Sequence, residues 1–195
     1  MMKSDKADKM LAALGTALEQ EKIGPVDILV CGAMALAMQG LIDRPTRDID
    51  GLAKVVHRGD SLTLRKPLMS KRFTEAVERV GITYGEGKFW FSTAATILHD
   101  DVKMPKGLAE RAEVRHFGNN LTVRLCSRVD MICLKMWAAI KRGEPDIGDL
   151  VHLKLTREEA ENAATWCLAQ DREAGPDLAA VLKEVGHGEL AERFS

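Results

Sequence analysis

The sequence has no apolar run near the roughly 20 residues that a membrane-spanning helix needs. Its first residues also lack the apolar core of a secretory signal. Neither sign of charge dominates, because 28 Lys and Arg face 29 Asp and Glu, which gives a net charge of −1. Such a balance disfavours a protein that grips nucleic acid over its whole surface. We therefore expect a cytoplasmic protein, without a membrane partner, that acts through a local site.

Closely spaced cysteines are missing too. The four cysteines are Cys31, Cys126, Cys133 and Cys167. They lie apart from one another in apolar contexts, and no two of them form a Cys-x-x-Cys motif. This distribution predicts reduced core thiols rather than disulfides or a zinc site. No internal repeat or low-complexity tract is present. With 195 residues, 46% apolar and 29% charged, the chain can build one domain, or a core with a helical appendage.

The first half of the chain alternates helical and strand patterns. Its expected elements are a helix over 4–22, a strand over 26–31, a helix over 33–40, a strand over 48–55 and a helix over 66–80. Gly24-Pro25 ends the first helix, and Gly81 is expected to end the last one. After the second strand we expect a polar connection over 58–61 that turns at Gly59-Asp60.

After a glycine-interrupted segment, a hairpin leads into helices. We expect strands over 113–117 and 121–125, joined by a turn at 118–120, and then helices over 127–142, 146–153, 156–170 and 176–186. Thr156 and Glu159 form a capping box. The predicted fold class is α/β (α+β): a small mixed sheet flanked by helices over 1–126, with a helical half over 127–195 packed on it as one unit.

Two carboxylates follow a glycine turn. Asp48 and Asp50 are two residues apart on an expected strand, so their side chains point to one face. Two adjacent anions repel unless a cation lies between them, and hard oxygen ligands suit Mg²⁺, which keeps other positions for water and phosphate oxygens. Gly32 ends the preceding strand, where it lets the backbone approach a ligand closely. The amides that open the next helix favour an anion. This order predicts a place for a metal-bound nucleoside triphosphate, whereas an Asp-x-Asp alone also fits a solvated strand edge.

The order of glycine turn, apolar helix, basic turn and acidic strand resembles the nucleotidyltransferase superfamily, which has the polymerase-β-like fold. The residues that carry the resemblance run from Gly32 to Gly40 and on through Arg44, Thr46, Asp48, Ile49 and Asp50. They look most like the branch of AbiEii-type toxins and their uncharacterised bacterial relatives. The resemblance implies Mg²⁺ or Mn²⁺ on the two aspartates and nucleotide contacts from Gly32, Ala33, Arg44, Thr46 and Arg47. The chain departs from the pattern at Ala33, where a second glycine or a serine is expected.

A second resemblance lies in the helical half. Lys135, Arg142, Asp146 and Asp149 stand where these nucleotidyltransferases have a helical lysine, a basic residue and an Asp-x-x-Asp helix start. The resemblance implies catalytic roles for Lys135, Asp146 and Asp149, and nucleotide contacts from Lys135 and Arg142. A lysine on a largely apolar helix face needs an anion. That anion is either a triphosphate or one of the two aspartates, in an ion pair that locks two helices together.

Three features stay open at this level. Glu113 is the only acidic residue in the expected hairpin strands, so it is the candidate for a third carboxylate, with a surface position as the default. Phe89-Trp90-Phe91 either packs in the core or stacks on a base. A cluster of seven basic residues in the segment after the acidic strand either forms a solvated surface or contacts RNA. Its members are Lys54, His57, Arg58, Arg65, Lys66, Lys71 and Arg72.

The function we expect from these patterns and the resemblance is a metal-dependent nucleotidyltransferase. It would transfer a nucleoside monophosphate from a nucleoside triphosphate to a hydroxyl at an RNA 3′ end or on a protein. The resemblance further implies a toxin of a toxin-antitoxin system, with an antitoxin protein encoded nearby as partner. One alternative is a nucleotide-binding or scaffold domain without catalysis. Another is a small-molecule nucleotidyltransferase of the aminoglycoside-modifying type.

Overall fold

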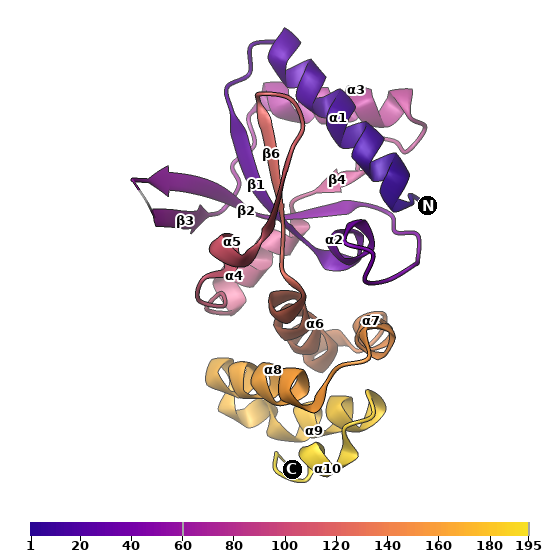
Figure 1. Cartoon of the computed structure of the whole chain (residues 1–195), viewed down its shortest axis with the longest axis vertical. Coiled ribbons are helices and arrows are strands. Elements are labelled where there is room, and N and C mark those ends of the chain that lie inside the picture. Colours follow the sequence, from indigo (N-terminus) through magenta and orange to yellow (C-terminus); the bar gives the residue numbers. More distant parts are fainter. Residues whose placement is uncertain (60, 195) are drawn as a thin grey trace. The chain divides into compact units, whose positions relative to one another are not determined.

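The computed structural model describes residues 1–59 and 61–194 and has the predicted mixed α/β (α+β) fold (Figure 1). Contacts divide the chain into two compact units, Met1–Ser127 and Arg128–Ser195. This boundary falls within one residue of the predicted one, whereas the packing of the two halves as one body stays a prediction. Among the described residues, no helix is both long and apolar enough to cross a membrane.

The first unit contains a sheet, helices and short turns. Its elements are α1 (Ser4–Gln20), β1 (Val26–Cys31), α2 (Gly32–Met38), β2 (Ile49–Arg58), β3 (Ser61–Arg65), α3 (Lys71–Thr83), β4 (Phe91–Ser92), η1 (Ala94–Ile97), α4 (Leu98–Asp101), α5 (Leu108–Arg111), β5 (Glu113–His116) and β6 (Leu121–Leu125). The second unit is helical, with α6 (Arg128–Arg142), α7 (Asp146–Leu153), α8 (Arg157–Gln170), η2 (Arg172–Ala174), α9 (Gly175–Glu184) and α10 (Gly188–Ala191).

The six-stranded sheet has the order β3-β2-β1-β6-β5, and the short β4 pairs with the start of β2. β1 runs antiparallel to β2 and parallel to β6, with a bulge in the β1–β2 ladder between Leu29 and Val30. β3 and β5 are therefore the outermost strands of the main sheet. The central strand, β1, is the one that leads directly into α2.

Strand alternation and register define two faces of this sheet. Ile28 of β1, Val123 of β6 and Arg115 of β5 are paired in register, so they point to one face. On this face Arg115 forms an ion pair with Asp8 of α1, and Phe91 packs edge-on against Phe73 of α3. We call this the helix-covered face. Asp27 points to the opposite face, and the register Cys31↔Asp50 places Asp50 there as well. We call this the Asp27 face.

Two expectations for the middle of the first unit are wrong. The polar connection expected over 58–61 is shorter, because Arg58 belongs to β2 and Ser61 to β3. Ser61–Arg65, where no element was expected beyond Ser61, alternates polar and apolar residues and pairs with β2. Consequently the next helix, α3, begins at Lys71, with Ser70 as its N-cap, instead of at residue 66. Asp60, half of the predicted turn, lies outside the described residues.

Gly81 does not end α3 as expected but lies inside it, where a close contact requires glycine. A Cβ atom at this position would lie 1.8 Å from the carbonyl oxygen of Gly87 and 2.6 Å from Cδ1 of Trp90. The Trp90 indole is fully buried and donates a hydrogen bond of 2.7 Å to the Val77 carbonyl. Phe91 is buried beside it, whereas Phe89 is 75% exposed. Two of the three aromatics therefore pack in the core.

The helical unit follows its predictions closely. α7 spans the predicted residues, and the capping box of Thr156 and Glu159 is present at the start of α8. All four cysteines are thiols rather than disulfides, as predicted. Burial raises the pKa of the Cys167 thiol strongly, and the nearby Cys133 acts in the same direction. That thiol is therefore protonated at neutral pH.

Candidate functional site

The two predicted carboxylates flank Ile49 at the start of β2. Asp48 immediately precedes the strand and Asp50 is its second residue, whereas Ile49 between them is fully buried. Both aspartates are half-buried. Burial raises the pKa of Asp48 above its usual value, although the adjacent Arg47 cation acts in the opposite direction. A cation bound beside this carboxylate would relieve that cost.

Gly32 lies directly against Asp50 at the turn from β1 into α2. Its φ of +80° is the left-handed conformation that glycine adopts without strain. A Cβ atom on residue 32 would lie 2.2 Å from Oδ2 of Asp50 and 3.1 Å from its Cγ. No other residue type therefore fits here without moving the carboxylate. The predicted opposition of glycine turn and acidic strand is present, with Ala33 buried in the first turn of α2.

The loop before the acidic pair is tied to the start of the chain. The amide of Met2 donates to the Thr46 carbonyl at 2.7 Å, and the Thr46 amide donates back at 2.9 Å. The Thr46 side chain is buried, and its hydroxyl donates to the Asp48 carbonyl at 3.1 Å. Thr46 thus fixes the backbone that carries Asp48. Of the two predicted basic contacts, Arg47 is exposed and Arg44 is half-buried.

The carboxylates of Asp48 and Asp50 would supply part of the ligand set of a magnesium ion. Two carboxylates separated by one residue offer hard oxygen ligands, and Mg²⁺ commonly takes one or two carboxylates and completes its shell with water and phosphate oxygens. Among residues 1–59 and 61–194, no group of three or more His, Cys, Asp or Glu side chains is arranged to hold a metal ion. The remaining ligands would have to come from the substrate and from water.

Glu113 does not lie with this pair. It belongs to β5, which is three strand steps, or roughly 14 Å, from β2. Its partner in register is Leu125, which lies on the helix-covered face, and its carboxylate accepts a hydrogen bond of 2.8 Å from Arg115. The default surface position therefore applies, and Glu113 supplies no third carboxylate to Asp48 and Asp50.

In the second unit, Lys135 is buried between two carboxylates. Its Nζ atom lies 2.6 Å from Oδ1 of Asp146 and 2.7 Å from Oδ2 of Asp149. Arg142 adds an ion pair of 2.6 Å to the other oxygen of Asp146. Burial by itself lowers the pKa of the Lys135 ammonium, but the charges and hydrogen bonds of both aspartates outweigh burial and raise it. The ion pair that locks α6 to α7 is thus present, and the catalytic and nucleotide roles stay predictions.

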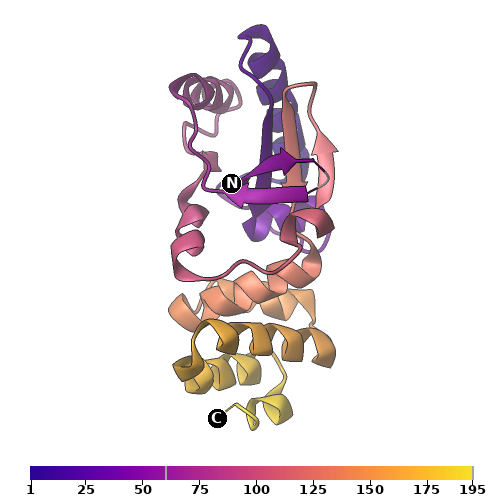
Figure 2. The ribbon, with the colours of Figure 1, turned by 90° about the vertical axis from the view of Figure 1, so that its left-hand side faces the viewer.

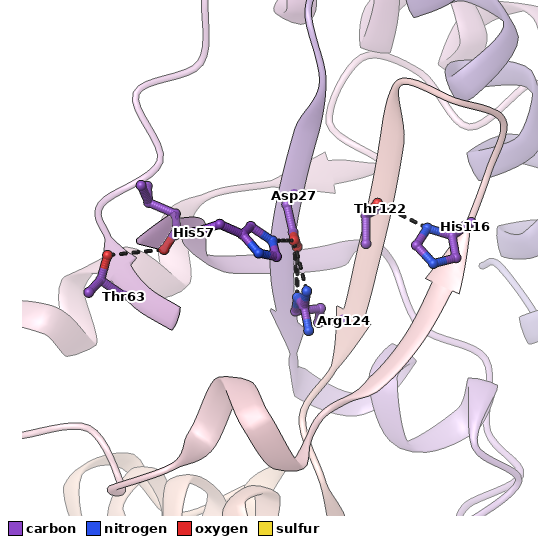
Figure 3. A network of polar contacts seen from close by, with 7 residues as sticks. Asp27, His57, Thr63, His116, Thr122 and Arg124 are labelled. Atoms are coloured by element: carbon purple, nitrogen blue, oxygen red, sulfur yellow. Dashed lines mark hydrogen bonds and ion pairs between the residues drawn. The ribbon is translucent and has the colours of Figure 1, made fainter. Parts of the chain in front are cut away.

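A polar network on the Asp27 face has no counterpart in the sequence predictions (Figure 3). The Arg124 guanidinium on β6 donates to both oxygens of Asp27 on β1, at 2.9 and 3.0 Å. His57 on β2 lies 2.9 Å from the same carboxylate. Asp27 is four residues from Cys31, the register partner of Asp50, so the network starts about 13 Å along the strand from the acidic pair.

The sequence carried a signal for this network, namely opposite charges inside two otherwise apolar strands. Asp27 and Arg124 are separated by 97 positions, and only the parallel pairing of β1 with β6 brings them together. Next to them, His116 lies 3.1 Å from the Thr122 hydroxyl. The Asp27 face is therefore polar over four strands, from His57 on β2 to His116 on β5, as well as acidic at the start of β2.

Comparison of the chain with family models, with curated proteins and with solved structures finds no match. The fold is mixed α/β, and its most distinctive local feature is the strand–glycine–helix turn that faces an acidic strand.

Proposed function

We propose that the first unit is a metal-dependent nucleotidyltransferase core. The observation that carries the proposal is the contact between Gly32 and Asp50, with Asp48 two positions before Asp50 in the chain. Gly32 and Asp50 meet at the end of the central strand β1, where α2 begins. The resemblance in the order of motifs supports the same activity.

In this proposal Asp48 and Asp50 hold the metal ion. A bound Mg²⁺ would supply the positive charge that neutralises the triphosphate and the departing pyrophosphate. Gly32 lets the β- and γ-phosphates approach the backbone, and Arg47 lies next to Asp48 to contact a phosphate. The acceptor oxygen bonds to the α-phosphorus while the bond to the pyrophosphate oxygen breaks. Asp50 takes the hydroxyl proton, because Glu113 is distant and Asp149 is engaged by Lys135.

Transfer of label tests this proposal. The purified chain is incubated with each α-labelled nucleoside triphosphate and Mg²⁺, with total RNA, with lysate protein or with an aminoglycoside as acceptor. We expect transfer to RNA or protein, and we expect Asp50→Asn to abolish it. Asp43→Asn is the matched control, because this exposed carboxylate lies on the same loop, before Asp48. Equal loss in both variants would contradict the assignment of the site.

A second candidate is a domain that binds nucleotides without transferring them. Two observations favour it: Ala33 replaces a residue that could contact phosphate, and the described residues place no third carboxylate beside the pair. Nucleotide binding that needs Asp50, without transfer to any acceptor, would support this candidate. Neither binding nor transfer would refute both.

The toxin role belongs to the proposal as well. We expect expression of the wild-type chain to arrest bacterial growth and the Asp50→Asn variant to be harmless at equal protein level. Growth arrest by both proteins would separate toxicity from nucleotide transfer. Rescue by the protein encoded next to this chain would identify that protein as the antitoxin partner.

A further inference from the structure

β3 forms an outer edge of the sheet. Every backbone hydrogen bond that Ser61–Arg65 makes to another backbone group within the described residues goes to β2. α5 (Leu108–Arg111) lies near β3, and in Figure 2 the β2–β3 hairpin lies toward the viewer. An edge strand whose outer side pairs with no other strand is a template for one.

The two sides of β3 differ in chemistry. Leu62 and Leu64 pair in register with His57 and Val55, so both leucines point to the Asp27 face, where they are half-exposed. Arg65 points to the opposite side, directly across from Lys54 of β2. A strand added to this edge would therefore meet apolar side chains on one of its faces and cations on the other.

Lys54 and Arg65 form a like-charge pair that lacks a counter-ion. Both side chains are exposed, and like charges directly opposite on neighbouring strands destabilise a sheet. Neither residue has an ion-pair partner in the part of the chain that the structure describes. The next cation along the chain, Lys66, does have one, because its ammonium lies 2.5 Å from Asp100. An anion from another molecule would relieve the repulsion between Lys54 and Arg65.

We propose that β3 is a docking edge for an extended segment of a partner protein in which acidic and apolar residues alternate. The segment adds one strand to the sheet and pairs its backbone with the outer edge of β3. Its acidic side chains lie beside Arg65 and within reach of Lys54, and its apolar side chains cover Leu62 and Leu64.

The residues around Lys54 and Arg65 favour a protein partner over a nucleic acid. Single-stranded nucleic acids are held by aromatic platforms on which the bases stack, together with a basic groove. The aromatic side chain that follows β3 most closely, Phe73, is only 3% exposed. Leucines and the backbone of an edge strand instead match the side chains and the main chain of a polypeptide strand.

Two fluorescent peptides test the proposal on the full chain. One alternates four Glu with four Val, and the other carries four Glu followed by four Val, so that charge and composition are equal. We expect the alternating peptide to bind at least about tenfold more tightly by fluorescence anisotropy, because only it places all acids on one strand face. We also expect it to slow amide hydrogen exchange over residues 61–65. Equal binding of both peptides would overturn strand addition.

Charge-reversed variants test the contribution of the two cations. We expect Lys54→Glu combined with Arg65→Glu to weaken binding of the alternating peptide by about tenfold or more. Lys9→Glu, at an exposed lysine on α1, is the matched control and should leave binding unchanged. If the double variant does not fold, the exchange measurement on the wild-type protein still decides. An oligouridine that protects residues 61–65 from exchange, where the peptide does not, would overturn the proposal in favour of a nucleic acid.

Discussion

The buried Lys135 cluster allows a prediction with a defined magnitude. Lys135→Met keeps most of the side-chain length but removes the charge. Asp146 and Asp149 are then left buried, with 0% and 2% of their side chains exposed, while Arg142 keeps its ion pair of 2.6 Å with Asp146. Removing one partner of a buried ion pair costs about 3–5 kcal/mol. We expect a loss of this size in the free energy of unfolding of the helical unit.

A second variant separates charge from packing. Lys135→Met combined with Asp149→Asn removes one charge of each sign, so Arg142 and Asp146 remain as a balanced pair. We expect this double variant to be more stable than Lys135→Met alone by about 1–3 kcal/mol, because contacting residues couple by this amount. Urea unfolding followed by tryptophan fluorescence measures both variants, since Trp137 and Trp166 lie in this unit. Asp149→Asn alone completes the cycle.

The pH dependence of stability gives an independent readout. The pKa of Lys135 is raised in the folded state, above its ordinary value of 10.5. The stabilisation is therefore fully present below about pH 10.5 and is lost as pH rises through the folded-state pKa. We expect wild-type stability to fall more steeply in alkali than that of Lys135→Met. If Lys135→Met unfolds at the same urea concentration as the wild type, the structural reasoning fails and a role in nucleotide handling is favoured.

Three further predictions concern single positions. Gly15→Ala on α1 should destabilise the first unit by about 1–3 kcal/mol despite the better helix propensity of alanine, because its Cβ would lie 1.9 Å from the Phe117 carbonyl oxygen; an unchanged thermal midpoint would contradict this. Gly32→Ala should displace the Asp50 carboxylate and abolish nucleotide transfer while the circular dichroism spectrum stays native; retained transfer would contradict the assigned contact. The pKa of Glu159 is lowered, chiefly by a hydrogen bond from Arg128. The stabilisation from Glu159 should therefore be present above about pH 4.5 and lost as pH falls below it. Glu159→Gln should flatten this part of the dependence of stability on pH, measured by urea unfolding.

The contact between the glycine turn and the acidic strand could be read from the sequence because each part depends on local periodicity. Gly32 ends a recognisable apolar strand, and Asp50 lies on the next one, whereas the shared facing of Asp48 and Asp50 stays a prediction. The strand β3 also had a local signal, the alternation of Leu62 and Leu64, but the neighbouring polar residues suggested a connection. Its pairing with β2 stabilises five residues that would otherwise be too short to form a strand alone.

Non-local geometry could not be read in the same way. The facing of Glu113 depends on its register with Leu125, and the partners of Asp27 depend on which strand lies next to β1. For Lys135 the sequence offered two anions, a ligand or an aspartate, because both satisfy a buried ammonium equally well. Only the distances of 2.6 and 2.7 Å to Asp146 and Asp149 distinguish an ion pair within the fold.

The ladder between Met2 and Thr46 has a practical consequence for work with this protein. Met2 is fully buried, and its two backbone hydrogen bonds anchor the loop that ends at Asp48. Loss of Met2 would remove both hydrogen bonds to Thr46 and would disturb Asp48, more than forty positions away in the chain.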